Sequence, residues 1–178
     1  MNSMDKGDFL SNMQTYVANI AISGSTLRNQ GAQGVVAAAR KFLGDLALRE
    51  LVCTEPPQYA CLLTKWTTEM RSRLPVNARH WGTARKAINV FMVQTFLNKY
   101  LCREFELHRF GDVLETPLDS KAASELRKKV PEPNLPNWNS IKALTEEDST
   151  LYQQAATTLA QRWHIPRACL DTVLWRAG

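Results

Sequence analysis

Two stretches decide how this chain is interpreted: Gly82-Thr83-Ala84-Arg85-Lys86-Ala87-Ile88-Asn89 and Pro117-Leu118-Asp119-Ser120-Lys121-Ala122. The glycine and small residues that open the first stretch predict a tight turn, followed by a helix that carries an inward-facing lysine. The second stretch predicts a helix that begins on a carboxylate, because aspartate is a preferred residue at a helix N-terminus. We therefore expect two helix starts to deliver Lys86 and Asp119 to one cleft.

Apolar residues recur at helical spacing over most of the chain, and no segment of useful length alternates as a strand does. This spacing predicts helices over residues 9–20, 35–46, 59–74, about 83–101, from 119 onward, 145–163 and 166–175. Residues 131–136 contain three prolines and cannot be helical throughout. The sequence therefore predicts an all-α fold with a single domain over residues 1–178.

The same spacing assigns side chains to the core. The predicted inner face of the first helix is Phe9, Met13, Tyr16, Val17 and Ile20. The predicted inner face of the 145–163 helix is Leu151, Tyr152, Ala155, Ala156, Leu159 and Trp163. Trp66, Trp163 and Trp175 are expected in the core, and the acidic residues between 103 and 117 are expected in an exposed loop.

Composition limits the classes of function. The chain has 178 residues and a net charge of +5, which favours a polyanionic partner. It has no uninterrupted apolar run of membrane length, so no membrane partner is expected. The four cysteines form no CxxC pair, and the three histidines have no ligand-spaced companions, so we expect a cytoplasmic protein without a metal or cofactor. We also expect a monomer.

Residues 82–89 resemble the hairpin and second helix of the helix-hairpin-helix DNA glycosylases, the superfamily of endonuclease III and the 8-oxoguanine glycosylases. In those enzymes a glycine-rich hairpin binds a DNA phosphate through backbone N–H groups, and a lysine in the second helix points into the base pocket. Gly82 matches the first hairpin glycine, Ala84 stands where a second glycine is usual, and Lys86 matches the lysine. Residues 117–121 resemble the later segment in which an aspartate caps a helix and is the catalytic carboxylate, here Asp119.

The resemblance implies a helical bundle with a cleft between two helical lobes. The hairpin and catalytic helices would span about 75–130, and the C-terminal helices at about 145–176 would pack back on the N-terminal helices. It also implies a DNA glycosylase, an enzyme that flips a modified base out of double-stranded DNA and hydrolyses its N-glycosyl bond to leave an abasic site. The four-cysteine cluster loop of endonuclease III is missing, and the interval from Lys86 to Asp119 is longer than usual.

Asp119 and Lys86 are the predicted catalytic residues, and each has an alternative. A carboxylate can stabilise the cation that develops on the sugar, whereas an aspartate at a helix start can also be a purely structural cap. A neutral Lys86 would attack the sugar C1′, form a Schiff base and cut the strand. A protonated Lys86 would hold a phosphate or a polar base substituent, and a surface lysine on a basic helix is the remaining interpretation.

DNA contacts are predicted in two places. The loop after the first helix lies where the family places the wedge that replaces a flipped nucleotide, although an ordinary polar loop has the same composition. The expected DNA-binding residues are Leu27, Arg28, Asn29, Gln30, His80, Trp81, Gly82, Thr83, Ala84, Arg85 and Lys121.

Several functions remain open at this point. As a whole the chain also resembles small bacterial glycosylases that defend against phages by excising hypermodified cytosines such as glucosylated hydroxymethylcytosine. A repair glycosylase for an oxidised or alkylated base and a non-catalytic helix-hairpin-helix DNA-binding module are alternatives. A metal-dependent nuclease would use Glu115, Asp119 and Lys121.

Overall fold

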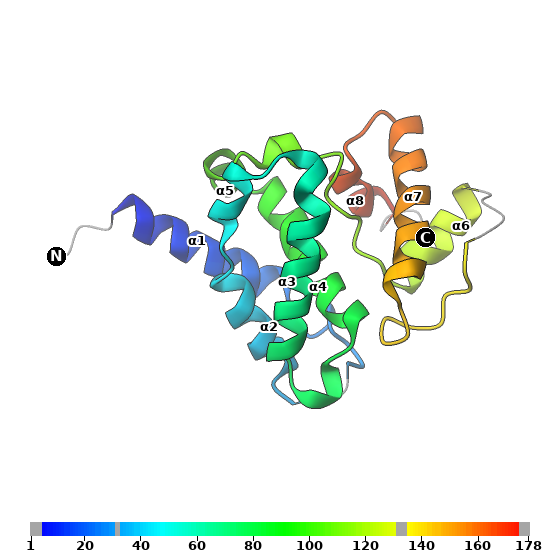
Figure 1. Cartoon of the computed structure of the whole chain (residues 1–178), viewed down its shortest axis with the longest axis horizontal. Helices are drawn as coiled ribbons and strands as arrows, with labels where there is room; N and C mark the ends of the chain where they lie inside the picture. The colour runs from blue at the N-terminus through cyan, green and yellow to red at the C-terminus, as the bar shows by residue number, and fades with distance from the viewer. Residues whose placement is uncertain (1–4, 31–32, 131–134, 175–178) are drawn as a thin grey trace.

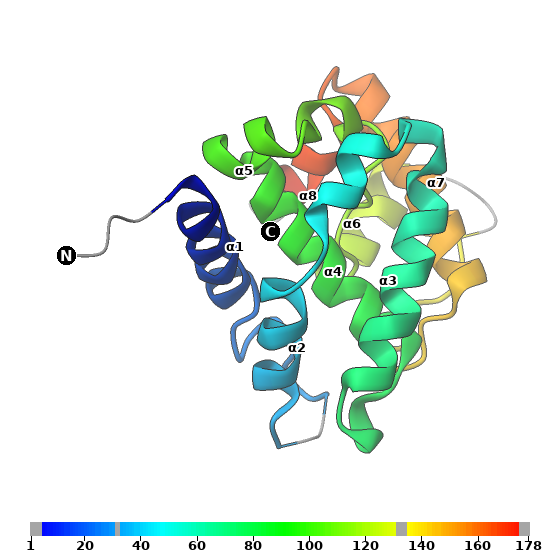
Figure 2. The same cartoon turned by 60° about the vertical axis from the view of Figure 1, so that its left-hand side comes forward.

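The computed structural model describes residues 5–30, 33–130 and 135–174. Within these residues every regular element is helical, which confirms the predicted all-α class (Figures 1 and 2). The α-helices are α1 (Lys6–Ala21), α2 (Val35–Gly44), α3 (Tyr59–Arg73), α4 (Trp81–Leu97), α5 (Lys99–Glu104), α6 (Ser120–Lys129), α7 (Glu146–Arg162) and α8 (Leu170–Leu174). Short 3-10 helices are η1 (Leu48–Cys53), η2 (Pro56–Gln58), η3 (Val76–Ala78), η4 (Leu107–Phe110) and η5 (Arg167–Cys169). No helix in these ranges is both long and apolar enough to cross a membrane.

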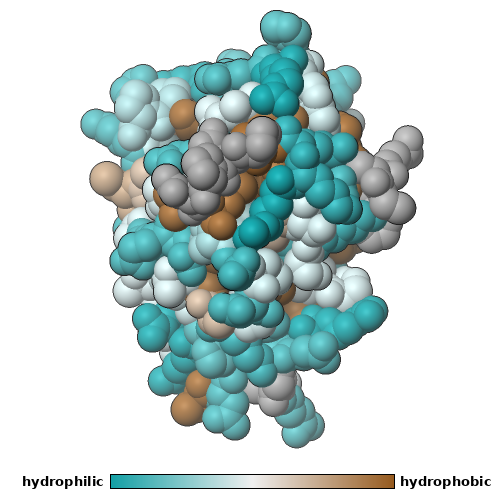
Figure 3. All heavy atoms as spheres, turned by 90° about the vertical axis from the view of Figure 1, so that its right-hand side faces the viewer, coloured by the Kyte–Doolittle hydropathy of each residue, from teal (hydrophilic) through white to brown (hydrophobic). Residues whose placement is uncertain are grey.

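The buried apolar side chains form two clusters. The larger cluster joins α1 to α5 with η4, and the smaller one joins α6, α7 and α8. In Figure 1 the helices of the smaller cluster lie together on one side of the molecule. Figure 3 shows the molecule from this side. Hydrophilic side chains predominate there, and apolar side chains are visible only in small areas.

Helix α4 is the most enclosed of the long helices. All residues from 82 to 89 are buried, as are Phe91, Met92, Val93 and Thr95. The helix packs on α3 and α1 within the larger cluster, and Trp81 at its start packs against the smaller cluster. Because α4 is enclosed in this way, each polar side chain on it needs a partner inside the protein.

The C-terminal helices differ from the expected packing of residues 145–176 against the N-terminal helices. The main contacts of α7 are with α6 and η5, and those of α8 are with α6 and η5. Residues 175 and 176, with the predicted core residue Trp175, lie outside the described residues. The apolar face of α7 packs instead against α6 and against the partly buried Trp138 and Trp163.

The predicted inner face of α1 is wrong at two positions. Tyr16 and Ile20 are 61% and 51% exposed, whereas Gln14 is buried. The Gln14 side-chain amide donates to the carbonyl oxygens of Leu43 at 2.9 Å and Leu46 at 2.8 Å. A polar residue can occupy the core when its donors are paired in this way, and apolar spacing alone does not identify it.

The predicted helix over 83–101 is broken at Asn98. The Asn98 side-chain oxygen accepts from the backbone N–H groups of Tyr100 at 3.1 Å and Leu101 at 3.1 Å, so it caps a new helix, α5. Of the acidic residues expected in an exposed loop over 103–117, Asp112 is exposed, whereas Glu104, Glu106 and Glu115 are half-buried. The same segment also carries the fully buried side chains Leu107, Phe110 and Leu114. Predicted helix starts at Asp119 and Thr145 are confirmed, since both side chains cap their helices.

The predicted tight turn at Gly82 is wrong, because Gly82 lies in the first turn of α4 and the connection from α3 to α4 is made by residues 74–80. A Cβ atom at this position would come within 2.1 Å of the carbonyl oxygen of Ile141 and 2.9 Å of the Leu144 Cβ. The glycine is therefore required for close packing of α4 against residues 141–144.

Gly82→Ala is expected to destabilise the protein by about 1–3 kcal/mol, because a backbone carbonyl must move to admit the methyl group. Urea unfolding followed by tryptophan fluorescence measures the change. Gly24→Ala is the control, since no described atom lies within 4 Å of its added Cβ. Equal stability of the two variants would contradict the packing role of Gly82.

Candidate active site

A cavity of about 580 Å³ lies where the two core clusters meet. Its walls come from the loop at residues 25–30, from Lys86 and Val90 of α4, from residues 117–121, from residues 138–141, and from Asp171 of α8. Five segments that are distant in sequence thus contribute to one hollow. Small-molecule sites occupy about 300–1,000 Å³, so the cavity has the size of a ligand pocket.

Lys86 and Asp119 meet in this cavity. The Lys86 Nζ lies 3.5 Å from the Asp119 Oδ2, and the two side chains are 9% and 32% exposed. The other carboxylate oxygen, Oδ1, accepts from the backbone N–H groups of Lys121 at 3.0 Å and Ala122 at 2.9 Å. A helix N-terminus favours negative charge, so Asp119 is presented as an anion with one oxygen facing the lysine.

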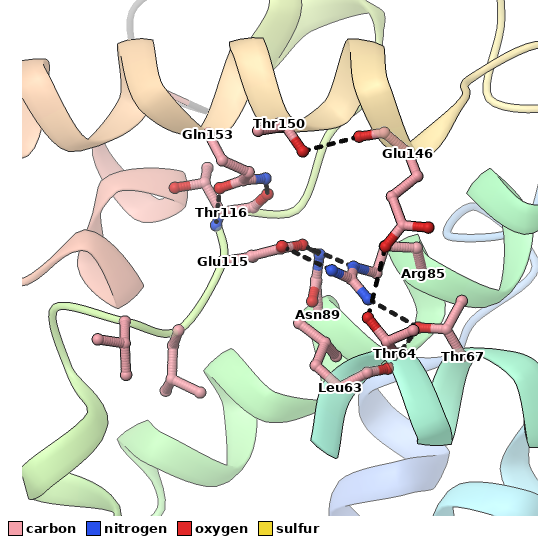
Figure 4. Close-up of polar contacts among 12 residues, drawn as sticks. Leu63, Thr64, Thr67, Arg85, Asn89, Glu115, Thr116, Glu146, Thr150 and Gln153 are labelled. Carbon is pink, nitrogen blue, oxygen red and sulfur yellow. Dashed lines mark hydrogen bonds and ion pairs between the residues drawn. The ribbon is translucent and has the colours of Figure 1, made fainter. Parts of the chain in front are cut away.

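The segment that leads to Asp119 is anchored to α4 by a buried ion pair (Figure 4). The Arg85 guanidinium donates to both oxygens of Glu115, at 2.8 Å each, and the Asn89 amide donates to Glu115 at 2.9 Å. A third guanidinium nitrogen donates to the Thr67 hydroxyl at 3.0 Å. Arg85 and Lys86 are consecutive cations on α4, and their partners are two carboxylates on the segment that runs into α6.

A second anchor holds the same segment from the other side. The Thr116 backbone N–H donates to the Gln153 side-chain oxygen at 3.0 Å, and the Gln153 amide donates back to the Thr116 carbonyl at 2.8 Å. Figure 4 shows Gln153 reaching this segment from α7 while Arg85 and Asn89 reach it from α4. Asp119 is therefore positioned by both core clusters.

The structure places Arg85 inside the protein. Its side chain is 7% exposed, is paired with Glu115, and has its guanidinium 5.0 Å from the centre of the Trp81 ring. Gly82, Thr83 and Ala84 are also buried. His80 and Trp81 are partly exposed and do not line the cavity. Residues 82–85, predicted to contact DNA, are thus buried inside the protein. His80 and Trp81, with the same prediction, lie outside the cavity.

The loop at residues 25–30 divides into a buried and an exposed part. Leu27 is 3% exposed, and Gln30 is buried with its side-chain oxygen accepting from the Thr83 hydroxyl at 2.5 Å. Arg28 and Asn29 are exposed and line the cavity, as does the partly exposed Lys121. Of the predicted DNA contacts, Arg28, Asn29, Gln30 and Lys121 therefore line the cavity, and among these four Gln30 is buried.

Asp171 is a cavity residue that sequence reasoning missed. It lies on α8, and burial, followed by the negative charge of Asp119, raises the pKa of its carboxyl to about 6, while Lys86 acts in the opposite direction. The carboxyl therefore takes up a proton at a pH well above the usual range for aspartate. The only sequence signal is that Asp171 is the one acidic residue after Asp148.

The three residues of the nuclease alternative are not gathered. Asp119 and Lys121 line the cavity, whereas Glu115 does not and is held by Arg85 and Asn89. Among the described residues, no group of three or more histidine, cysteine or acidic side chains is arranged to hold a metal ion. The four cysteines are all described, and each is free.

Comparison with protein-family models, with curated proteins and with solved structures found no match to this chain. The cavity and its charged groups are therefore the features of the molecule that indicate its function.

Proposed function

We propose that the protein is a DNA N-glycosylase that takes a flipped, modified base into the 580 Å³ cavity and hydrolyses its bond to the sugar. The observation that carries this proposal is the Lys86–Asp119 pair, 3.5 Å apart and open to the cavity. The proposed architecture is a divergent helix-hairpin-helix arrangement, with residues 74–80 between α3 and α4 in place of the hairpin. The proposed working unit is a monomer.

Asp119 supplies the electrostatic part of the reaction. As the N-glycosyl bond breaks, positive charge develops on the sugar, and a carboxylate held beside it stabilises the transition state. The caps from Lys121 and Ala122 hold one oxygen of Asp119, so the carboxylate needs no reorganisation during the reaction. The same carboxylate orients the water that attacks C1′ and accepts its proton.

The cavity lining supports a base with a polar substituent. Ser25, Thr26, Asn139 and Ser140 add hydroxyl and amide groups to the walls, and Trp138 offers an aromatic ring. A single pyrimidine ring fills only part of the volume. We therefore propose glucosylated hydroxymethylcytosine of phage DNA as the substrate and antiviral defence as the role, with an oxidised or alkylated base as the repair alternative.

Electrostatics supports a DNA partner. Arg28 and Lys121 lie at the cavity wall, the chain carries a net charge of +5, and Asn29 adds a neutral hydrogen-bonding group. Cations around a pocket contact phosphates and leave the identification of the base to the pocket itself. The phosphate contacts are thus assigned to Arg28 and Lys121.

Base release from a panel of DNAs tests the function. The panel contains unmodified, hydroxymethylated, glucosylated, oxidised and alkylated duplexes, incubated with the protein in EDTA and then heated in alkali. A glycosylase leaves alkali-labile abasic sites on at least one duplex. Direct cleavage without alkali and only with added metal would indicate the nuclease, and binding without any abasic site would indicate the non-catalytic module.

Lys86 is expected to act as a cation rather than as a nucleophile. In the ion pair with Asp119 its amine bears a proton, and an ammonium group has no electron pair with which to attack C1′. Borohydride added during the reaction is therefore expected to trap no covalent protein–DNA complex, while abasic sites still form. A trapped complex that disappears in Lys86→Met and persists in the control Lys65→Met would instead establish a Schiff base on Lys86.

A further inference from the structure

Asp171 has a defined position but no part in the stabilisation of the sugar. It lines the same cavity as Lys86 and Asp119, and α8 is anchored by Leu170 and Leu174, which are 0% and 1% exposed. Helix α8 packs on α6, the helix that Asp119 caps. The fold thus brings a second carboxyl group to the cavity from α8, which follows α6 and α7 in the chain.

We infer that Asp171 is a catalytic acid, which holds a proton in the cavity and donates it to the departing base. This inference rests on the proposed function and adds a second carboxyl group to it. Asp119 and Asp171 then have opposite roles, one as an anion that stabilises the sugar cation and one as a neutral acid that neutralises the leaving group.

The proton balance assigns a task to each group. The bond between C1′ and the base nitrogen breaks, its electron pair goes to the base, and the Asp171 proton goes with it. Water forms the new bond to C1′, and its proton passes to Asp119. The products are the free base and an abasic site, and proton exchange with solvent returns both carboxyl groups to their starting states.

The environment of Asp171 favours its protonated form. The charged groups that face it are Asp119 at the start of α6 and Lys86 on α4, and burial together with the Asp119 charge raises the Asp171 pKa to about 6. Arg167 on the adjoining η5 is engaged elsewhere, with carbonyl oxygens of Val113 and Leu114 and the Thr157 hydroxyl. Lys121 and Arg28 line the same cavity. Two carboxyl groups with different environments are a recurrent arrangement for acid and base roles.

The pH profile of single-turnover base release tests this assignment. For the wild-type protein the rate is expected to fall about tenfold per pH unit above the pKa of Asp171, because the active form carries the proton. Asp171→Asn keeps the shape of the side chain but donates no acidic proton, so its rate at pH 6 is expected to be about 100-fold lower and to lose this alkaline limb. Asp45→Asn, at an exposed position, is the matched control.

A second readout follows from the raised pKa. Because the folded protein holds the Asp171 proton more tightly than the unfolded chain does, ionising this group costs stability as the pH rises from about 4 through about 6. The urea midpoint of Asp171→Asn is therefore expected to exceed that of the wild type at pH 8, with a smaller difference at pH 4.

The outcomes separate this inference from the proposed function. Release by the wild type with an unchanged pH profile in Asp171→Asn would overturn the acid role and leave the glycosylase intact. Absence of release from every DNA would overturn both. An Asp171→Asn variant that loses release and also unfolds more easily at pH 8 would show that Asp171 is structural, and this too would overturn the acid role.

Discussion

Asp119→Asn is expected to lower the single-turnover rate of base release by about 100- to 1,000-fold, the usual effect of removing one preorganised electrostatic group from an active site. Asparagine retains a side-chain oxygen that caps a helix, so α6 is expected to form normally. The variant loses the negative charge that faces the Lys86 Nζ and the developing sugar cation. Free base, quantified over time with enzyme in excess over DNA, measures the change.

A matched control separates charge from capping. Asp5 caps α1 by accepting from the Asp8 backbone N–H at 2.7 Å. It is exposed and does not line the cavity. Asp5→Asn therefore makes the same chemical change at another helix start and is expected to leave base release unaltered. Equal rates for Asp119→Asn and the wild type would remove Asp119 from the catalytic role, whatever the DNA affinity of the variant.

Glu115→Ala is expected to destabilise the protein by about 3–5 kcal/mol, because it leaves the buried Arg85 guanidinium without its counter-ion. It also removes the acceptor of the Asn89 amide and releases the segment that positions Asp119. The cost is a large part of the stability of a typical domain. Urea unfolding gives the free energy, and base release is expected to fall as well because Asp119 loses its support.

Two further variants identify the cause. Arg85→Met combined with Glu115→Gln leaves no unpaired charge and is expected to recover most of the lost stability. Glu50→Gln breaks the exposed Lys65–Glu50 pair and is expected to cost less than about 1 kcal/mol. A double variant as unstable as Glu115→Ala would contradict the explanation by an uncompensated buried charge.

The sequence predicts local features of this fold well where one residue carries the signal. Asp119 and Thr145 are caps by their own side-chain chemistry, and the helices begin after them. Asn98 belongs to the same class, but it lies within an apolar run, and spacing alone extended the helix through it. Periodicity also assigned Tyr16 and Ile20 to the core, because it does not reveal which side of α1 its neighbours cover.

The candidate site is only partly predictable from the sequence, because the partner of each side chain depends on how distant segments pack. Lys86 and Asp119 are brought together in space, as their motifs suggested. An arginine that binds DNA and an arginine that pairs with a carboxylate inside the protein look the same in a sequence. Only the position of Glu115 in the fold shows that Arg85 is of the second kind. Asp171 lies in a helix with no motif, and its relation to Asp119 arises from the packing of α8 on α6. Contacts of this kind depend on the complete fold.

Mass spectrometry of the small molecules released from DNA shows whether the protein excises a base and whether Asp119 is needed for it. Wild-type protein and Asp119→Asn are incubated in parallel with glucosylated phage DNA and with the other modified duplexes. The wild type is expected to release a free modified base, with abasic sites in equal amount, and Asp119→Asn is expected to release little or none. No free base from any of the DNAs, or equal release by the two proteins, would contradict it.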